Sequence, residues 1–395
     1  EAAAVARSPA TAGDGDDRDV PLGPCPGDDD FADPGVLRQY ELVQKLGHGQ
    51  FAVVWHAVEK RSRQAVALKK LYAALETPRR AQMAYREIAV LEKLQGHPNI
   101  VELRHVLQAS ESLTEIDVYL VFGLWEADLH AAIRGRVLET KHLAFITCQV
   151  LRALAHMHQL GFVHRDVKPS NILINTRCKV KLCDFGHARS LAALDEPASH
   201  NNTAGSQTTD YTGSRWYRAP ESLLGTTRVT EAVDLWGLGC VLAEMLQGEP
   251  VFPGNSTSHQ LGLIVQVTGR PTHEEVESLG ISSAAAQLDE RVLGDVEPQA
   301  LSQKFSKATA ESLDFIRMCL QFVPGQRTSA KDALAHPYLI EYFHEGLEAL
   351  EPEPPQGLFL DDNILFGIDE YKHMISKNIA QRVKAMRKRN TQDFD

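Results

Sequence analysis

The chain has 395 residues, 43% of them hydrophobic, and a net charge of −11. This length and apolar content suit a globular enzyme of about two domains, whereas an acidic protein lacks the clustered cations that sequence-independent nucleic-acid binding requires. No apolar run approaches the roughly 18 residues of a membrane-spanning helix, so we expect neither a nucleic acid nor a membrane as a partner.

The first segment, residues 1–38, is predicted to be a disordered tail. It is rich in Ala, Gly, Pro and Asp and has almost no large apolar residues. Little apolar surface is therefore available to offset the entropy that the chain loses on ordering. The first 40 residues hold nine acidic residues and three arginines, which gives this end of the chain a charge of −6.

The sequence from residue 39 onward predicts strands first and helices afterwards. Short β-rich segments bounded by turn residues predict strands at 40–43, 52–58, 65–71, 101–107 and 116–122. Helical spacing of apolar residues predicts a helix at 79–94, between the third and fourth strands, and further helices at 143–158, 232–246 and 310–322. This segregation predicts an α+β fold with two lobes, 39–125 and 126–342, followed by a C-terminal extension, 343–395.

Five short motifs follow one another along the two predicted lobes. They are Gly-His-Gly-Gln-Phe-Ala-Val-Val at 47–54, Val-Ala-Leu-Lys at 66–69, His-Arg-Asp-Val-Lys-Pro-Ser-Asn at 164–171, Asp-Phe-Gly at 184–186 and Ala-Pro-Glu at 219–221. Each motif alone is weak, but together and in this order they resemble the signature set of protein kinases. The resemblance implies the bilobal protein kinase fold, with ATP and Mg²⁺ as substrate and cofactor.

The first two motifs are expected to form the nucleotide site. Gly47 and Gly49 lack a Cβ, so the backbone between two strands can close over a triphosphate. Lys69 offers a positive charge to the α- and β-phosphates, and Glu87 on the 79–94 helix is its expected partner, although a solvated helix face is the ordinary place for a glutamate. The resemblance assigns nucleotide binding to Leu46, Gly47, His48, Gly49, Gln50, Phe51, Ala52, Val53, Val54, Ala67, Lys69, Phe122, Leu124 and Trp125. For Phe122, packing in the core is an equally good interpretation.

The later motifs are expected to carry the transfer chemistry. Asp184 and Asn171 supply the oxygen ligands that Mg²⁺ prefers. Asp166 accepts or orients the proton of the substrate hydroxyl, and Lys168 faces the transferred phosphoryl group. By resemblance, a lysine at this place is typical of serine/threonine kinases.

Residues 209–221, Thr-Asp-Tyr-Thr-Gly-Ser-Arg-Trp-Tyr-Arg-Ala-Pro-Glu, resemble the activation lip of mitogen-activated protein (MAP) kinases. Cyclin-dependent kinases share the end of this segment but lack the Thr-x-Tyr. The stretches 182–186, 251–254 and 256–261 are similar to the atypical extracellular-signal-regulated kinases of types seven and eight. The resemblance implies phosphorylation of Ser/Thr-Pro sites in protein substrates. It extends over residues 40–342, and residues 361–379 loosely resemble the family's C-terminal extension, which packs on the N-lobe.

The lip also predicts a switch, in which phosphorylation of Thr209 and Tyr211 activates the enzyme. By resemblance, three arginines receive the phosphate on Thr209 and two receive the phosphate on Tyr211; they are Arg86, Arg165 and Arg189, and then Arg215 and Arg218. The sequence leaves open whether an upstream MAP-kinase kinase or the enzyme itself adds these phosphates. We further expect a buried ion pair between Glu221 and Arg327 to hold the base of the lip.

The sequence departs from the family pattern at Ala52, Gly123 and His187, which replace a glycine, an acidic residue and a leucine. Two further hypotheses stay open at this point. The alternatives to a MAP kinase are a kinase-fold scaffold and a cyclin-dependent-kinase-like enzyme, although a scaffold would be free to lose residues that this chain retains.

The cellular setting is also predicted from sequence. The six cysteines lack metal-ligand spacing, which is typical of a reduced, intracellular protein. The basic run 384–389 is either a nuclear-import or acidic-partner patch or simply a charged helix end, so we expect a cytoplasmic location and leave a nuclear one open. The sequence begins at Glu1 rather than Met and therefore neither indicates nor excludes a targeting segment.

Overall fold

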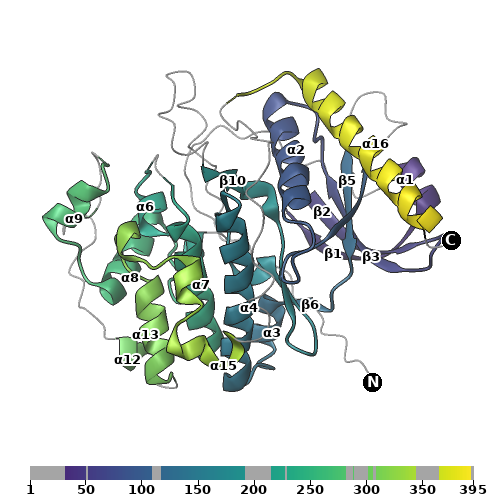
Figure 1. The fold of residues 1–395 in the computed structure, drawn as a ribbon. Helices are drawn as coiled ribbons and strands as arrows, with labels where there is room; N and C mark the ends of the chain where they lie inside the picture. The colour runs from purple at the N-terminus through teal and green to yellow at the C-terminus, as the bar shows by residue number, and fades with distance from the viewer. Residues whose placement is uncertain are drawn as a thin grey trace.

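The computed structural model describes residues 32–49, 52–108, 117–191, 215–226, 229–281, 288, 301–305, 308–343 and 364–392. A strand-rich N-lobe and a helix-rich C-lobe lie against each other (Figure 1). This arrangement confirms the predicted α+β fold with segregated strands and helices. In the described part of the chain, no helix combines the length and the apolar character that crossing a bilayer demands.

The N-lobe is built on one antiparallel sheet with the strand order β1-β2-β3-β5-β4. Its strands are β1 (Tyr40–His48), β2 (Ala52–Glu59), β3 (Ala65–Leu71), β4 (Leu103–Gln108) and β5 (Val118–Gly123). The helix α2 (Pro78–Lys93) lies between β3 and β4 in the sequence; Thr77 caps its N-terminus and accepts a hydrogen bond from the Arg80 amide. All five predicted strands and the predicted helix are confirmed, with small differences at their ends.

The predicted boundary of the disordered tail, residue 38, is wrong, because the structure gives residues 34–39 as a helix. Residues Pro34–Gln39 form a short helix, α1, whose N-cap Asp33 accepts a hydrogen bond from the Gly35 amide. Ala32 and Val36 are buried in a cluster on the outer face of the sheet, and the Asp33 amide donates to the Tyr119 hydroxyl at 2.9 Å. The buried side chains, the cap and the bond to Tyr119 together hold this segment on the sheet. Residues 1–31 lie outside the described part of the chain.

The C-lobe is organised around α4 (Thr140–Gln159) and α7 (Ala232–Gln247). Most of α7 is buried, which explains why its sequence is apolar on all sides. The helix α13 (Ala310–Cys319) packs against α7 but ends before the predicted residue 322. The Arg327 side chain donates to the carbonyl groups of Gln321 and Phe322, which follow the end of the helix.

Shorter elements complete the described chain. They are β6 (Ala127–Asp128), α3 (Leu129–Arg134), β7 (Phe162–Val163), η1 (Pro169–Asn171), β8 (Ile172–Ile174), β9 (Val180–Leu182), η2 (Phe185–His187), β10 (Arg189–Ser190), η3 (Arg215–Tyr217), α6 (Pro220–Leu223), α8 (Thr257–Thr268), α9 (His273–Ser278), α12 (Leu301–Lys304), η4 (Pro324–Gln326), α14 (Ala330–Ala333), η5 (Pro337–Leu339) and α15 (Ile340–Phe343).

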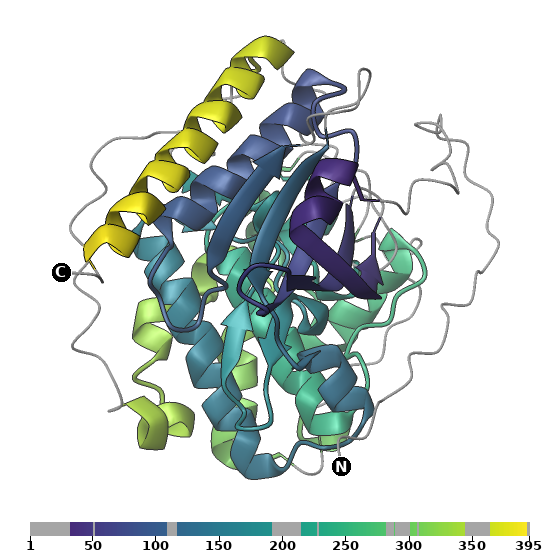
Figure 2. The ribbon, with the colours of Figure 1, turned by 90° about the vertical axis from the view of Figure 1, so that its right-hand side faces the viewer.

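The last helix, α16 (Ile368–Gln392), returns from the end of the C-lobe to the N-lobe and runs beside α2 (Figures 1 and 2). Tyr371 and Ile375 are buried at this contact. Arg382 donates to the Leu103 carbonyl at 3.0 Å and pairs with Glu92 of α2 at 3.3 Å. The extension therefore packs on the N-lobe, as the resemblance implied.

Candidate functional site

Three charged side chains from different elements meet between the two lobes. The Lys69 ammonium of β3 lies 2.7 Å from Glu87 Oε1 on α2 and 3.0 Å from Asp184 Oδ1. Glu87 is thus not on a solvated helix face, because its side chain is only 4% exposed. The contacts place the predicted phosphate-binding lysine directly beside the predicted metal ligand.

The electrostatics of this cluster favour the charged forms of Lys69 and Asp184, whereas burial raises the pKa of the Glu87 carboxyl. Lys69 holds the pKa of the Asp184 carboxyl below its ordinary value, although burial acts in the opposite direction. Burial opposes the charge on Lys69, but Asp184 and Glu87 together raise the pKa of its ammonium. Asp184 also has a left-handed backbone, with φ of 64°, which is uncommon for a residue with a Cβ. An uncommon backbone at a charged cleft residue is typical of functional sites.

A second cluster surrounds Asp166, the predicted proton acceptor. Asp166 Oδ2 accepts hydrogen bonds from Lys168 Nζ at 2.6 Å and from Asn171 Nδ2 at 2.9 Å. Burial opposes ionisation of Asp166, but Lys168 and His187 outweigh it and leave the pKa of this carboxyl below its usual range. Because the Asn171 amide nitrogen is directed at Asp166, its amide oxygen is left on the other side of the group for a different ligand.

The loop that carries Asp166 is anchored by Asp234 at the start of α7. Asp234 is fully buried and accepts from the backbone amides of His164 and Arg165 at 2.8 and 2.7 Å, while His158 Nε2 lies 2.9 Å from its Oδ2. Arg165 itself has a positive φ of 69°. Asp234 therefore positions the loop without facing the cleft, and we did not identify it from the sequence. The only indication was a carboxylate near the start of a strongly apolar helix.

His164 links this loop to the Asp-Phe-Gly segment. Its Nε2 lies 3.1 Å from the Cys183 carbonyl, and its ring stands edge-on to Phe185 with the ring centroids 5.1 Å apart. A Cβ on Gly237 of α7 would meet the Val167 carbonyl at 2.8 Å, so a side chain there would push the loop away. This position requires glycine because α7 touches the loop backbone.

The structure places half of the predicted nucleotide residues around the two strands of the glycine-rich turn. Leu46, Gly47 and His48 belong to β1, and the Gly49 amide donates to the Ala52 carbonyl at 2.8 Å, which closes the described part of the turn. Gln50 and Phe51, at its tip, lie outside the described residues.

Strand alternation separates the next two residues of that set. Val54 pairs with Lys69, so these two side chains share a face of the sheet. Val53 is instead buried in the cluster on the outer face. The Val53 side chain therefore points away from the cleft, so only its backbone is left for a nucleotide, and the assignment of Val53 to nucleotide binding stays a prediction.

The back of the cleft is formed by β3, β5 and the segment that follows. Ala67 pairs with Phe122, which is 8% exposed and packs in the main core, while Leu124 and Trp125 follow at the link between the lobes and are half-buried. A Cβ on Gly123 would lie 3.1 Å from the Arg104 guanidinium. The glycine that departs from the family pattern therefore makes room for an arginine of β4.

The predicted phosphorylation sites, Thr209 and Tyr211, lie outside the described residues, and so do residues 192–208. The segment after them is fixed to the C-lobe: Arg215 donates to the Asn255 carbonyl at 3.2 Å, and the Trp216 indole donates to the Gly254 carbonyl at 3.1 Å. Tyr217 donates to Glu244 Oε2 at 2.6 Å, a contact that we did not predict.

The five predicted phosphate receptors are distributed over both lobes. Arg86 is buried on α2, and Arg189 of β10 pairs in register with Val163, two residues before Arg165. Burial lowers the pKa of Arg218, and nearby Asp166 opposes that shift. The base of the lip is held as expected, because Arg327 binds Glu221 through two parallel hydrogen bonds of 2.7 and 2.8 Å.

The donor set fits Mg²⁺ with ATP. Lys69 provides a fixed cation, Asp184 a carboxylate and Asn171 an amide oxygen, and hard oxygen ligands of this kind suit Mg²⁺. Asp166 lies beside Lys168, so a proton acceptor and a cation face the same space. Such a site can align a hydroxyl group with a polyphosphate and stabilise the charge that is transferred.

Comparison with known proteins agrees with this geometry. The family model described as "Protein kinase domain" matches residues 40–339. Extracellular signal-regulated kinase 2 of Dictyostelium discoideum is 42% identical over 359 residues, which cover 91% of this chain and 95% of that protein. Mitogen-activated protein kinase 15 of Caenorhabditis elegans is 36% identical and is matched over 74% of its length, and mitogen-activated protein kinase mpkB of Aspergillus fumigatus is 38% identical and is matched over 89%. These matches cover 89% and 82% of this chain, respectively.

Proposed function

Because the chain belongs to the protein kinase family and, within it, to the MAP kinases, it is a serine/threonine protein kinase, and we propose that it phosphorylates Ser/Thr-Pro sites with Asp166 as the proton acceptor. The substrate hydroxyl oxygen forms a bond to the γ-phosphorus of ATP, and the bond from that phosphorus to the β–γ bridging oxygen breaks. The hydroxyl proton passes to Asp166, and ADP leaves.

Each group of the two clusters has a role in this reaction. Lys69, held by Glu87, orients the α- and β-phosphates, and Lys168 stabilises the phosphoryl group as it moves between oxygens. Asp184 and Asn171 would hold Mg²⁺, which supplies positive charge that neutralises the phosphate oxygens. Asn171 also donates to Asp166 and directs the acceptor oxygen of that carboxylate.

The observation that carries the proposal is the Lys69 bridge to both Glu87 and Asp184. A kinase-fold scaffold would have no need to bring all three charges together. The test is transfer of phosphate from Mg·ATP to matched peptides containing Ser-Pro or Ser-Ala, with Asp184→Asn as the inactive control. Equal rates for both peptides would contradict the Pro preference, whereas no transfer to either, before and after phosphorylation of the lip, would favour the scaffold.

We also infer that phosphorylation of Thr209 and Tyr211 switches the enzyme on. Phosphate on Thr209 would add about −1.5 to −2 charge and would join Arg86 of α2 to Arg165, which precedes Asp166 in the catalytic loop, and to Arg189. Phosphate on Tyr211 would be received by Arg215 and Arg218. Support comes from the position of Arg86 on the helix that carries Glu87, since a contact there bears on the Lys69–Glu87 pair.

This switch is tested with Thr209→Ala and Tyr211→Phe, assayed with and without an added MAP-kinase kinase. Variants that keep full activity would contradict it. Gain of activity in wild type without the added enzyme would identify autophosphorylation. A requirement for a cyclin-type subunit would instead support the cyclin-dependent-kinase-like alternative.

A further inference from the structure

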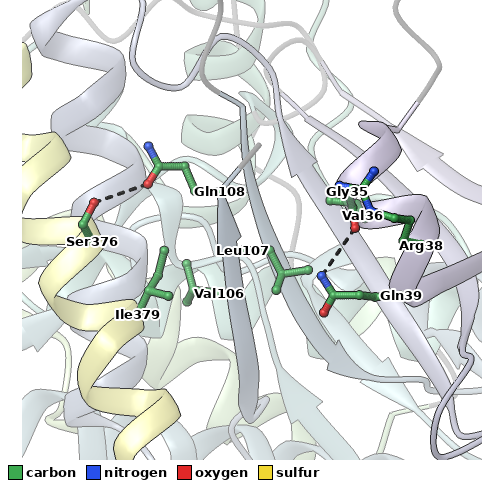
Figure 3. A pocket seen from close by; sticks show the side chains of 9 residues that line it. All are labelled: Gly35, Val36, Arg38, Gln39, Val106, Leu107, Gln108, Ser376 and Ile379. Atoms are coloured by element: carbon green, nitrogen blue, oxygen red, sulfur yellow. Dashed lines mark hydrogen bonds between the residues drawn. The ribbon is translucent and has the colours of Figure 1, made fainter. Parts of the chain in front are cut away.

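The last helix, α16, contacts both the helix α2 and the edge strand β4. Figure 3 shows the contact with β4 from close by, at a pocket of about 440 Å³ whose lining residues lie outside the two catalytic clusters. Ser376 of α16 donates to Gln108 Oε1 at 3.3 Å, and Ile379 lies beside Val106 (Figure 3). The C-terminal extension is therefore bound to the sheet as well as to α2.

Arg382 joins these three elements through all the nitrogens of its guanidinium. Its Nε donates to Asn378 Oδ1 of α16 at 3.0 Å, its Nη1 donates to the Leu103 carbonyl of β4 at 3.0 Å, and its Nη2 lies 3.3 Å from Glu92 Oε1 of α2. The Arg382 side chain is only 12% exposed, so water competes little for these contacts. A planar guanidinium with donors in fixed directions suits a place between three acceptors. The contact at Glu92 therefore fixes α2 against both α16 and β4.

Glu87 and Glu92 lie on different sides of α2. Glu87 is bonded to Lys69 in the cleft. Glu92 follows five residues later, about 140° further around the helix axis, and is bonded to α16. Because a helix moves as a rigid element over so short a distance, a shift of α2 at Glu92 also shifts Glu87 relative to Lys69.

We propose that Arg382 is a positioning residue for the phosphate-binding cluster, which holds α2 where Glu87 reaches Lys69. This inference rests on the role proposed above for the Lys69–Glu87 pair in orienting ATP. Arg382 lies on the side of α2 away from Lys69, so its effect on the reaction passes through the helix and involves no contact with a substrate. The C-terminal extension thereby takes part in ATP use.

Steady-state kinetics of the full chain test the proposal with Arg382→Met, which removes the guanidinium but keeps a long side chain. We expect kcat/KM for ATP to fall about fivefold, less than on loss of Glu87 itself, because the Lys69–Glu87 contact can still form. The KM for a peptide substrate at saturating Mg·ATP should change less than about twofold. Hydrogen–deuterium exchange of residues 78–93 should become faster. The matched control is Arg317→Met, since Arg317 is exposed on α13, and it should leave these three measurements unchanged.

Combination with Glu87→Gln separates positioning from a general loss of stability. If Arg382 acts through Glu87, Arg382→Met should lower kcat/KM for ATP no further in the Glu87→Gln background. A further fivefold loss there would overturn the proposal, and so would an unchanged kcat/KM for ATP in the Arg382→Met single variant. If Glu87→Gln alone had no effect on ATP use, the proposed role of the Lys69–Glu87 pair would fail and this inference with it. A loss in Glu87→Gln without one in Arg382→Met would overturn this inference alone.

Glu92→Gln provides a second variant that leaves α16 in place, because Arg382 keeps its bonds to Leu103 and Asn378. We expect about a twofold fall in kcat/KM for ATP, since the guanidinium then meets a neutral amide in place of a carboxylate. Adding Glu92→Gln to Arg382→Met should cause no further loss. Independent, additive losses would show that the two residues do not act through one contact and would overturn the proposal.

Discussion

The two clusters of the active site are held in different ways. Asp166 lies on a loop whose backbone amides are bonded to a fully buried carboxylate, Asp234, within one lobe. Lys69, by contrast, is held by side chains that come from a strand, a helix and the Asp-Phe-Gly segment, and Asp184 is 41% exposed. The proton-accepting side is therefore preformed, whereas the phosphate-binding side depends on how α2 and the Asp-Phe-Gly segment are placed. A contact that moves α2 therefore acts on the second cluster, which depends on the placement of that helix.

The largest effect is expected from Asp166→Asn, which removes the proton acceptor from the preformed side. The amide can still receive hydrogen bonds from Lys168 and Asn171 but accepts a proton poorly, so we expect kcat to fall by about 10²–10⁴. The melting temperature should change little. The matched control is Asp369→Asn, since this carboxylate is 99% exposed on α16. A variant that retains wild-type kcat would show that Asp166 does not accept the proton.

Asp234→Ala tests the anchor of the same loop. The substitution leaves the amides of His164 and Arg165 buried without an acceptor and deprives His158 of its partner, so we expect a loss of about 3–5 kcal/mol in the free energy of unfolding. Denaturant titration measures the stability. Hydrogen–deuterium exchange of residues 162–171 reports the loop directly, and unchanged protection there would contradict the assigned anchoring role.

Glu87→Gln should affect the phosphate-binding side more gently. Lys69 keeps Asp184 as a partner but loses a charged hydrogen bond, so we expect kcat/KM for ATP to fall about 10–100-fold, equivalent to ~1.4–2.8 kcal/mol. Exchange protection of residues 162–171 should stay as in wild type. If that loop loosened as well, the two clusters would be coupled more tightly than their contacts indicate.

The residue pattern within each segment and the order of the motifs predict the fold well here, because the signals for strands, turns and helices all indicate the same architecture. The five strands and α2 follow from alternation and from turn residues, and the Lys69–Glu87 pair follows from the order of the motifs. Asp234 could not be found in this way, because its role exists only once α7 packs against a distant loop. The end of the disordered tail was predicted wrongly for a related reason. Ala32 and Val36 are buried by packing on the outer face of the sheet, and this contact cannot be read from the sequence of their own segment.

The smallest expected effect concerns the junction of the two lobes, where His97, in the link between α2 and β4, stacks on His156 of α4 with ring centroids 4.8 Å apart. Burial and the neighbouring cationic side chains, His156, Lys181 and Arg152, lower the pKa of His97 to about 3. A hydrogen bond also holds the imidazole ring, because His97 Nδ1 accepts from the Asn99 amide. The folded protein therefore keeps this ring neutral at a pH where the unfolded chain, with an ordinary pKa near 6.5, binds a proton. Stability that is fully present above about pH 6.5 is consequently lost as the pH falls toward 3.

We expect His97→Gln to remove about 1 kcal/mol of the stability difference between pH 7 and pH 5.5, since one unit of pKa shift corresponds to about 1.4 kcal/mol. Denaturant titrations at the two pH values measure this difference. His273→Gln is the control, because that histidine is exposed on α9. An equal pH dependence in wild type and His97→Gln would show that His97 is protonated in the folded enzyme as readily as in the unfolded chain, and the junction between the lobes would then be wetter than its stacked histidines indicate.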